Sequence, residues 1–167
     1  MVEIDNIPSD ISENIKFINL SKKDEAYYHI YFNDNANEVK NNYFSKEDNI
    51  YKVKIIIDLK IKSLNSLFQT RNYINKISFI RFNRKDITDM SCMFDECSSL
   101  KEINFNRFIT DNVTNMNYMF NKCSSLNELN LNAFNTMNVK EMSAIMVENY
   151  FSNNKNAKIY KRISPKS

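Results

Sequence analysis

Residues 87–112 read ITDMSCMFDECSSLKEINFNRFITDN, and residues 113–138 read VTNMNYMFNKCSSLNELNLNAFNTMN. Aligned end to end, these two 26-residue segments carry the same residue at 14 of 26 positions. The apolar positions continue at the same spacing upstream through residues 61–86 and downstream as far as Met146. A fixed period of this length is typical of proteins built from stacked repeats. Such proteins usually bind other molecules and rarely catalyse reactions.

Each unit changes its apolar spacing halfway along. The apolar residues of Met90–Cys97 fall at i, i+3, i+4 and i+7, which predicts a helix of about two turns with Thr88 as its N-cap. The segment Lys101–Asn106 alternates apolar and polar residues, which predicts a short strand. We expect the core to include Phe94, Leu100, Ile103, Phe120, Leu126 and Leu129. One helix and one parallel strand per unit predict a short α/β solenoid.

The strand half of each unit resembles a leucine-rich repeat. It reads L-x-x-I-x-F-x-x-F from Leu100 to Phe108 and L-x-x-L-x-L-x-x-F from Leu126 to Phe134, with Phe where the common repeat has Asn. Together with the T-(D/N)-M-(S/N)-x-M-F…C-S-S-L core, it closely resembles the BspA-like leucine-rich-repeat family. This resemblance implies a leucine-rich-repeat-type solenoid used for recognition, often as an adhesin on cell surfaces, and it offers no catalytic residues.

We expect two regions in the chain. Residues 1–60 form an N-terminal β region, in which β-prone segments separated by turn signals predict a meander that caps the first repeat. These segments are Ala26–Phe32, Val39–Phe44 and Tyr51–Leu59. Residues 61–163 form the repeat region. Its units are 61–86, 87–112, 113–138 and a degenerate closing unit, 139–163.

Composition excludes several functions. The 167 residues include 28 Asn and no Gly, so the chain contains neither of the Gly-rich phosphate-binding motifs. Backbone positions with positive φ must then fall to Asn or Asp.

The net charge of +3 is too small to indicate a nucleic-acid partner. Residues 155–166 contain five basic residues and no acidic one, which we interpret as a solvated end while leaving an electrostatic partner open.

The sequence also bears on location. The first 15 residues carry four acidic residues and no basic one, which does not resemble a signal peptide. No apolar stretch approaches the ~20 residues of a membrane-spanning helix, so no membrane insertion is expected. The location stays open: we expect a cytoplasmic protein from the lack of a signal peptide, or a cell-surface protein if the chain is a fragment of a longer exported one. Three Cys, an odd number, favour a reducing compartment.

No constellation of residues predicts catalysis, a metal site or a bound cofactor. Catalytic strings such as G-x-S-x-G and H-E-x-x-H do not occur, and the only His, His29, is interpreted as a strand side chain. Cys97 and Cys123 occupy one slot of consecutive units and are interpreted as buried thiols rather than as a disulfide or zinc pair. We therefore predict a non-enzymatic protein with no small-molecule substrate. An enzyme with a cryptic site in the N-terminal region is the less favoured alternative.

The best functional candidate is the outward face of the predicted strands. Residues that alternate with the core align into three columns when units stack, and repeat proteins commonly use such a face for partners. The simpler interpretation is a solvated strand face. The hypothesis is an interaction module that binds a partner protein, and its alternative is a surface adhesin fragment. The predicted partner-binding residues are Lys76, Ser78, Ile80, Glu102, Asn104, Asn106, Glu128, Asn130 and Asn132.

Overall fold

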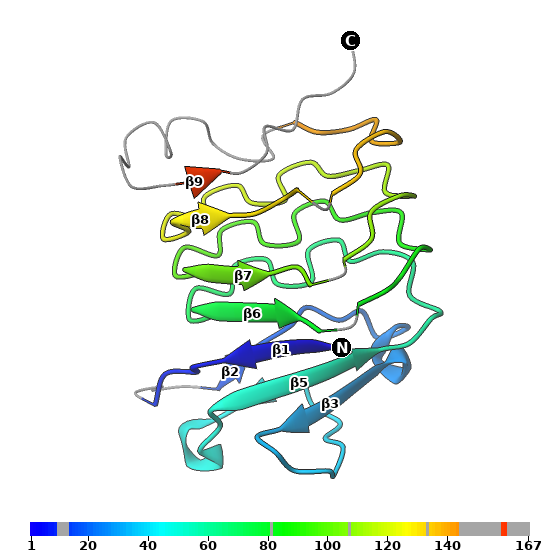
Figure 1. Cartoon of the computed structure of the whole chain (residues 1–167). Helices are drawn as coiled ribbons and strands as arrows, with labels where there is room; N and C mark the ends of the chain where they lie inside the picture. The colour runs from blue at the N-terminus through cyan, green and yellow to red at the C-terminus, as the bar shows by residue number, and fades with distance from the viewer. Residues whose placement is uncertain (10–13, 81, 107, 133, 144–157, 160–167) are drawn as a thin grey trace.

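The computed structural model describes residues 1–9, 14–80, 82–106, 108–132, 134–143 and 158–159 (Figure 1). It is mostly β-structure. The strands are β1 Val2–Asp5, β2 Ile15–Lys16, β3 Tyr28–Phe32, β4 Tyr43–Phe44, β5 Lys52–Ile57, β6 Lys76–Phe79, β7 Glu102–Asn104, β8 Glu128–Leu129 and β9 Lys158–Ile159. The two short 3₁₀ turns are η1 Glu25–Tyr27 and η2 Lys46–Asp48. The predicted closing unit, 139–163, is described only at 139–143 and 158–159, and most of the basic stretch 155–166 lies outside the described residues.

A mixed five-stranded sheet in the order β3-β5-β1-β6-β7 joins the N-terminal region to the repeats (Figure 1). Strand β1 pairs antiparallel with both β5 and β6, and β6 pairs parallel with β7. Two further pairs lie outside this sheet, antiparallel β2–β4 and parallel β8–β9. The first strand of the chain therefore lies at the centre of the sheet, beside the first strand of the repeats.

Alternating burial explains why β1 pairs as it does. Val2 and Ile4 are fully buried, and Ile4 lies opposite Val53 of β5 and Ile77 of β6. Because side chains alternate along a strand, Glu3 and Asp5 belong to the other face of the sheet. The expected segments Ala26–Phe32 and Tyr51–Leu59 contain β3 and β5, and Val39–Phe44 contains only the two-residue strand β4. No strand was predicted at β1.

The 26-residue units lie above one another in register, as Figure 1 shows for β6, β7 and β8. Parallel bridges join Ser63 to Asp89, Asp89 to Asn115 and Asn115 to Glu141. Along the wall behind the strands, alternate N–H groups donate to carbonyl groups of the next unit. Phe94 N–H, for example, donates to Met119 O at 3.0 Å. Hydrogen bonds between neighbouring units hold this wall together.

The predicted helix-plus-strand fold is wrong, because the described residues contain no α-helix. Met90–Cys97 forms two consecutive β-turns, with Met93 N–H donating to Met90 O and Cys97 N–H to Phe94 O. Thr88 is consequently not an N-cap, and its N–H donates to Lys62 O at 2.8 Å. The predicted leucine-rich-repeat solenoid is thus replaced by a mostly β fold with a mixed sheet.

These turns also correct the expectation for positive φ. Asn6, Asn33 and Asn49 have positive φ as expected, but the third residue of each turn in the repeats has it as well. Those residues are Ser66, Thr70, Cys92, Glu96, Tyr118 and Lys122, with φ between 54° and 63°. A third residue with positive φ is characteristic of type II turns, where glycine is preferred. The chain has no glycine, so ordinary residues occupy these strained positions.

Stacked phenylalanine rings run through the core. Phe94 lies between Phe68 and Phe120, with ring centroids 5.5 and 5.4 Å apart and planes within 6°. A second column comprises Phe82, Phe108 and Phe134. Five of the six predicted core residues are buried, and Ile103 is only partly buried. Ile103 belongs to β7, the strand at the edge of the five-stranded sheet.

Candidate binding groove

Strands β6 and β7 align the first two rows of the predicted columns. Lys76 is in register with Glu102, and Ser78 with Asn104. The Lys76 ammonium lies 2.6 Å from the Glu102 carboxylate, and this hydrogen bond raises the pKa of Lys76 above its ordinary value. One pair of opposite charges on this face is thus aligned along the stacking direction.

The nine predicted residues differ in exposure. Six are exposed: Glu102, Asn104, Asn106, Glu128, Asn130 and Asn132. Lys76 and Ile80 are half-buried. Ser78 is 8% exposed, because β6 is flanked on both sides and the longer side chains of Glu3 and Asn104 lie in register with it. Ser78 is therefore poorly placed to contact a partner.

A groove of about 700 Å³ runs between the strand segments of the second and third repeats. Its lining consists of Lys101, Glu102, Ile103, Asn104, Phe105, Asn127, Glu128, Asn130 and Asn132. Five of the nine predicted residues belong to this lining: Glu102, Asn104, Glu128, Asn130 and Asn132. Within the described residues, the groove coincides with a break in the sheet, because β7 ends the five-stranded sheet and β8 pairs with β9.

The floor of the groove is apolar, and the equivalent apolar residues of the neighbouring repeats are fully buried. Ile77 and Leu129, one repeat before and after Ile103, are fully buried, whereas Ile103 is only partly buried. Phe105 is 9% exposed, whereas the equivalent Phe79 and Leu131 are at 0%. The strand of the second repeat therefore exposes apolar surface that the adjacent strands bury. Carboxylates and amides border this floor on both sides.

The N-terminal part of the same face was not predicted from the sequence. Glu3 of β1 is in register with Lys54 of β5, and Asp5 with Lys52. The Lys54 ammonium in turn lies 5.1 Å from the centre of the Tyr31 ring on β3. The alternation of apolar and acidic residues in the VEID segment of residues 2–5 was the available signal.

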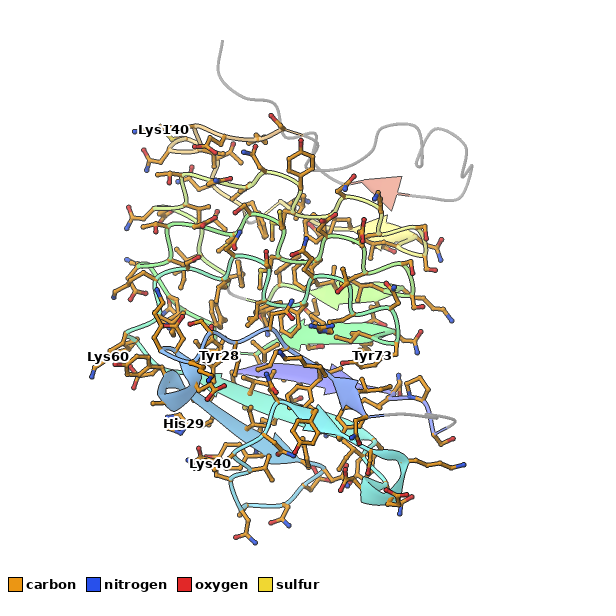
Figure 2. All side chains as sticks on the ribbon, turned by 180° about the vertical axis from the view of Figure 1, so that it is seen from behind. Tyr28, His29, Lys40, Lys60, Tyr73 and Lys140 are labelled. Atoms are coloured by element: carbon orange, nitrogen blue, oxygen red, sulfur yellow. The ribbon has the colours of Figure 1, made fainter. Side chains whose placement is uncertain are left out.

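The only histidine lies away from the groove. His29 belongs to β3, and Figure 2 shows it with Lys40 toward the end of the molecule that β3 forms, whereas Lys140 lies toward the opposite end. Its Nδ1 atom is 3.2 Å from the Glu38 carboxylate, which also accepts a hydrogen bond from Lys40 at 2.6 Å. The hydrogen bond from Lys40 lowers the pKa of Glu38 below its ordinary value. The Glu38 carboxylate thus contacts both an ammonium group and an imidazole at the surface.

The repeat cysteines are buried against the main chain. The Cys97 thiol donates to Phe68 O at 2.9 Å, and the Cys123 thiol donates to Phe94 O at 3.0 Å. Burial raises the pKa of Cys97 to about 12 and also raises that of Cys123. Among the described residues, no group of three or more His, Cys, Asp or Glu side chains could hold a metal ion. The same residues include no helix long and apolar enough to cross a membrane.

Comparison with known proteins identifies one family. The model of the family described as Mycoplasma protein of unknown function, DUF285, matches residues 62–163, which include all the described repeats. No curated protein and no solved structure matches the chain. The resemblance to the BspA-like leucine-rich-repeat family is therefore corrected, since neither that family nor another leucine-rich-repeat family is found.

Proposed function

This chain belongs to the DUF285 family, and we propose that it is a non-enzymatic interaction module that binds a partner protein through its strand face. The observation that carries the proposal is the groove between the second and third repeats, with Ile103 and Phe105 in its floor. Exposed apolar surface bordered by polar side chains is the usual composition of protein-recognition surfaces. The contact would be centred on β7 and β8.

The chemistry of the lining supports binding rather than catalysis. Glu102 and Glu128 are the carboxylates of the groove, and the other polar groups are amides and one ammonium group. The Glu102 carboxylate lies 2.6 Å from the Lys76 ammonium and is already engaged in this ion pair. The remaining groups are suited to hydrogen bonding with a partner.

The test is a binding measurement with two matched variants. Partner candidates are captured from native cell lysate, identified, purified and titrated against the chain by isothermal titration calorimetry. One variant combines Glu102→Ala, Asn104→Ala, Glu128→Ala and Asn130→Ala. The control also removes two exposed carboxylates and two exposed amides, but outside the groove: Glu25→Ala, Asn37→Ala, Glu47→Ala and Asn83→Ala.

We expect the groove variant to weaken binding at least about tenfold, which corresponds to ~1.4 kcal/mol, and the control to leave the affinity unchanged. Circular dichroism melts should show that both variants remain folded. Equal affinities for the two variants would exclude the groove as the binding surface. Failure of every captured protein to bind in the titration would exclude the interaction itself.

A further inference from the structure

The groove runs along the strands. Its lining on the side of the second repeat is the continuous segment from Lys101 to Phe105, which spans about 13 Å at the usual rise of a strand. An extended peptide of four to five residues has about the same length. Its side chains would alternate, and those facing the floor would be about 6.6 Å apart. Ile103 and Phe105 are likewise two residues apart, so successive floor-facing side chains match their spacing.

From this geometry we propose that the groove binds an extended peptide segment that runs alongside β7 and β8 and carries a basic side chain. The inference rests on the proposed function and specifies the partner's chemistry. Apolar side chains at alternate positions would contact Ile103 and Phe105. The basic side chain would lie toward the carboxylates of Glu102 and Glu128.

The amides of the groove suit a peptide backbone. A carboxamide carries both a donor and an acceptor, as a peptide group does. The Oδ1 atom of Asn130 already accepts the N–H of Asn132 at 3.0 Å. Within the part of the chain that the structure describes, this leaves the Nδ2 donor of Asn130 for a carbonyl of the peptide. Asn104 offers a second amide on the opposite side of the groove.

The charges of the lining favour a basic side chain. The lining contains two carboxylates, Glu102 and Glu128, and one ammonium group, Lys101. Glu102 is paired with Lys76, whose side chain is 33% exposed, so a ligand's Lys or Arg would share this carboxylate rather than meet an isolated charge. Exposed pairs of this kind are weak and salt-dependent. They would select among peptides, and the apolar floor and amides would supply the rest of the affinity.

A single-stranded nucleic acid fits the groove less well. Its phosphates would meet two carboxylates, and its bases would need an exposed aromatic ring for stacking. The aromatic ring of the lining belongs to Phe105, which is only 9% exposed and is packed against neighbouring rings. A peptide needs only apolar contact with that floor.

The experiment is selection from a phage library of random linear peptides on the immobilised full chain. Enriched sequences are synthesised with a fluorescent label and measured by fluorescence polarisation. Two variants are compared with the unmodified chain. Glu102→Gln with Glu128→Gln removes charge and keeps shape, whereas Asn104→Ala with Asn130→Ala removes the amides.

We expect enriched peptides to alternate apolar and polar residues and to share a Lys or Arg. The Gln variant should weaken their binding about fivefold to tenfold, but it should leave unchanged a peptide whose basic residue is replaced by Gln. The Ala variant should weaken both peptides. High salt should weaken only the basic peptide.

Three results would overturn the inference. They are no enrichment, enrichment of acidic peptides, and enriched peptides that bind both variants as tightly as the unmodified chain. A partner that loses affinity for the fourfold groove variant, while none of its linear segments binds, would uphold the proposed function and refute the extended-peptide inference. A labelled oligonucleotide that binds and is displaced by no peptide would refute it as well.

Discussion

Truncating Phe94 should remove a large part of the stability of the repeats. Its side chain is fully buried between Phe68 and Phe120, and Phe79 and Phe105 approach it edge-on at 6.2 and 6.4 Å. Replacing a buried Phe by Ala costs about 3–5 kcal/mol, and each lost aromatic pair is worth ~0.5–1.5 kcal/mol beyond buried area. Because four rings surround Phe94, we expect Phe94→Ala to lie near the upper end, at about 4–5 kcal/mol.

Urea denaturation followed by far-UV circular dichroism measures this loss as a shift in midpoint at constant slope. The comparison is Tyr43→Ala, which truncates an aromatic residue that is 49% exposed and should cost no more than ~0.5 kcal/mol. Phe94→Leu keeps most of the apolar volume, so it should fall between the two. A Phe94→Ala loss below about 1 kcal/mol would refute a continuous ring column spanning the repeats.

Three further predictions concern the turns, an ion pair and the thiols. Thr70→Gly removes a β-branched side chain from a backbone position at φ 63°, so it should raise the free energy of unfolding by about 0.5–1 kcal/mol. The control Thr114→Gly should lower the free energy of unfolding. Equal effects of the two substitutions in urea titrations would contradict this prediction. Hydrogen bonds from Arg84, and then from Lys62, hold the pKa of Asp86 below its ordinary value. The stability that ionised Asp86 contributes is present above about pH 4 and is lost as pH falls further. Asp86→Asn should therefore flatten the acid side of a profile of unfolding free energy against pH. An unchanged slope would exclude a contribution of Asp86 to stability. At pH 8, iodoacetamide should modify Cys92 well before Cys97 and Cys123 in the folded protein, since Cys92 is partly exposed and the other two thiols are buried. Burial raises the pKa of all three thiols, so even Cys92 should react more slowly than a free thiol. Mass spectrometry showing all three labelled equally before unfolding would contradict the burial of Cys97 and Cys123.

The repeat period was readable from the sequence, but the conformation within each unit was not. Apolar residues at i, i+3, i+4 and i+7 describe one face of a helix, and they equally describe the first and last residues of two consecutive four-residue turns. In Met90–Cys97 these are Met90 with Met93 and Phe94 with Cys97. Glycine at the third turn position would have distinguished the two structures. The chain has none, and Cys92 and Glu96 occupy those positions with positive φ.

Hydrogen bonding explains why the turns can exist without a helix. A helix satisfies its N–H groups within the segment, whereas here Met90, Cys92, Phe94 and Glu96 donate to carbonyls of the next unit. This solution is available only when the next unit is stacked in register. The preference is therefore a tertiary effect, which analysis of the period within one unit does not capture.

The N-terminal strand was missed for a different reason. The alternation in Val2–Asp5 covers only four residues, and its two acidic side chains resemble a polar chain end, so this weak signal did not predict a strand. Its place is determined by pairing with β5 and β6, which lie about 50 and 75 residues further along the chain. Strand alternation does explain its burial once those partners are known. Local pattern and long-range pairing thus determine different parts of the sheet.

Alternation along the strands predicts which polar side chains of the groove are exposed, but not how deeply its apolar side chains are buried. Alternation correctly assigned Glu102, Asn104, Glu128, Asn130 and Asn132 to exposed positions. It assigned Ile77, Ile103 and Leu129 to equivalent core positions, and nothing in these apolar residues distinguishes the partly buried Ile103 from the other two. The difference arises because β7 ends one sheet and β8 belongs to another.

Replacing Ile103 tests whether a partner recognises the open floor of the groove. Ile103→Asp should weaken binding more than any single polar substitution at the rim, because it places a charge on the apolar contact itself. Calorimetry with the purified partner decides this, provided that the variant melts like the unmodified chain. A larger loss from Asn104→Ala than from Ile103→Asp would place recognition at the amides instead of the floor.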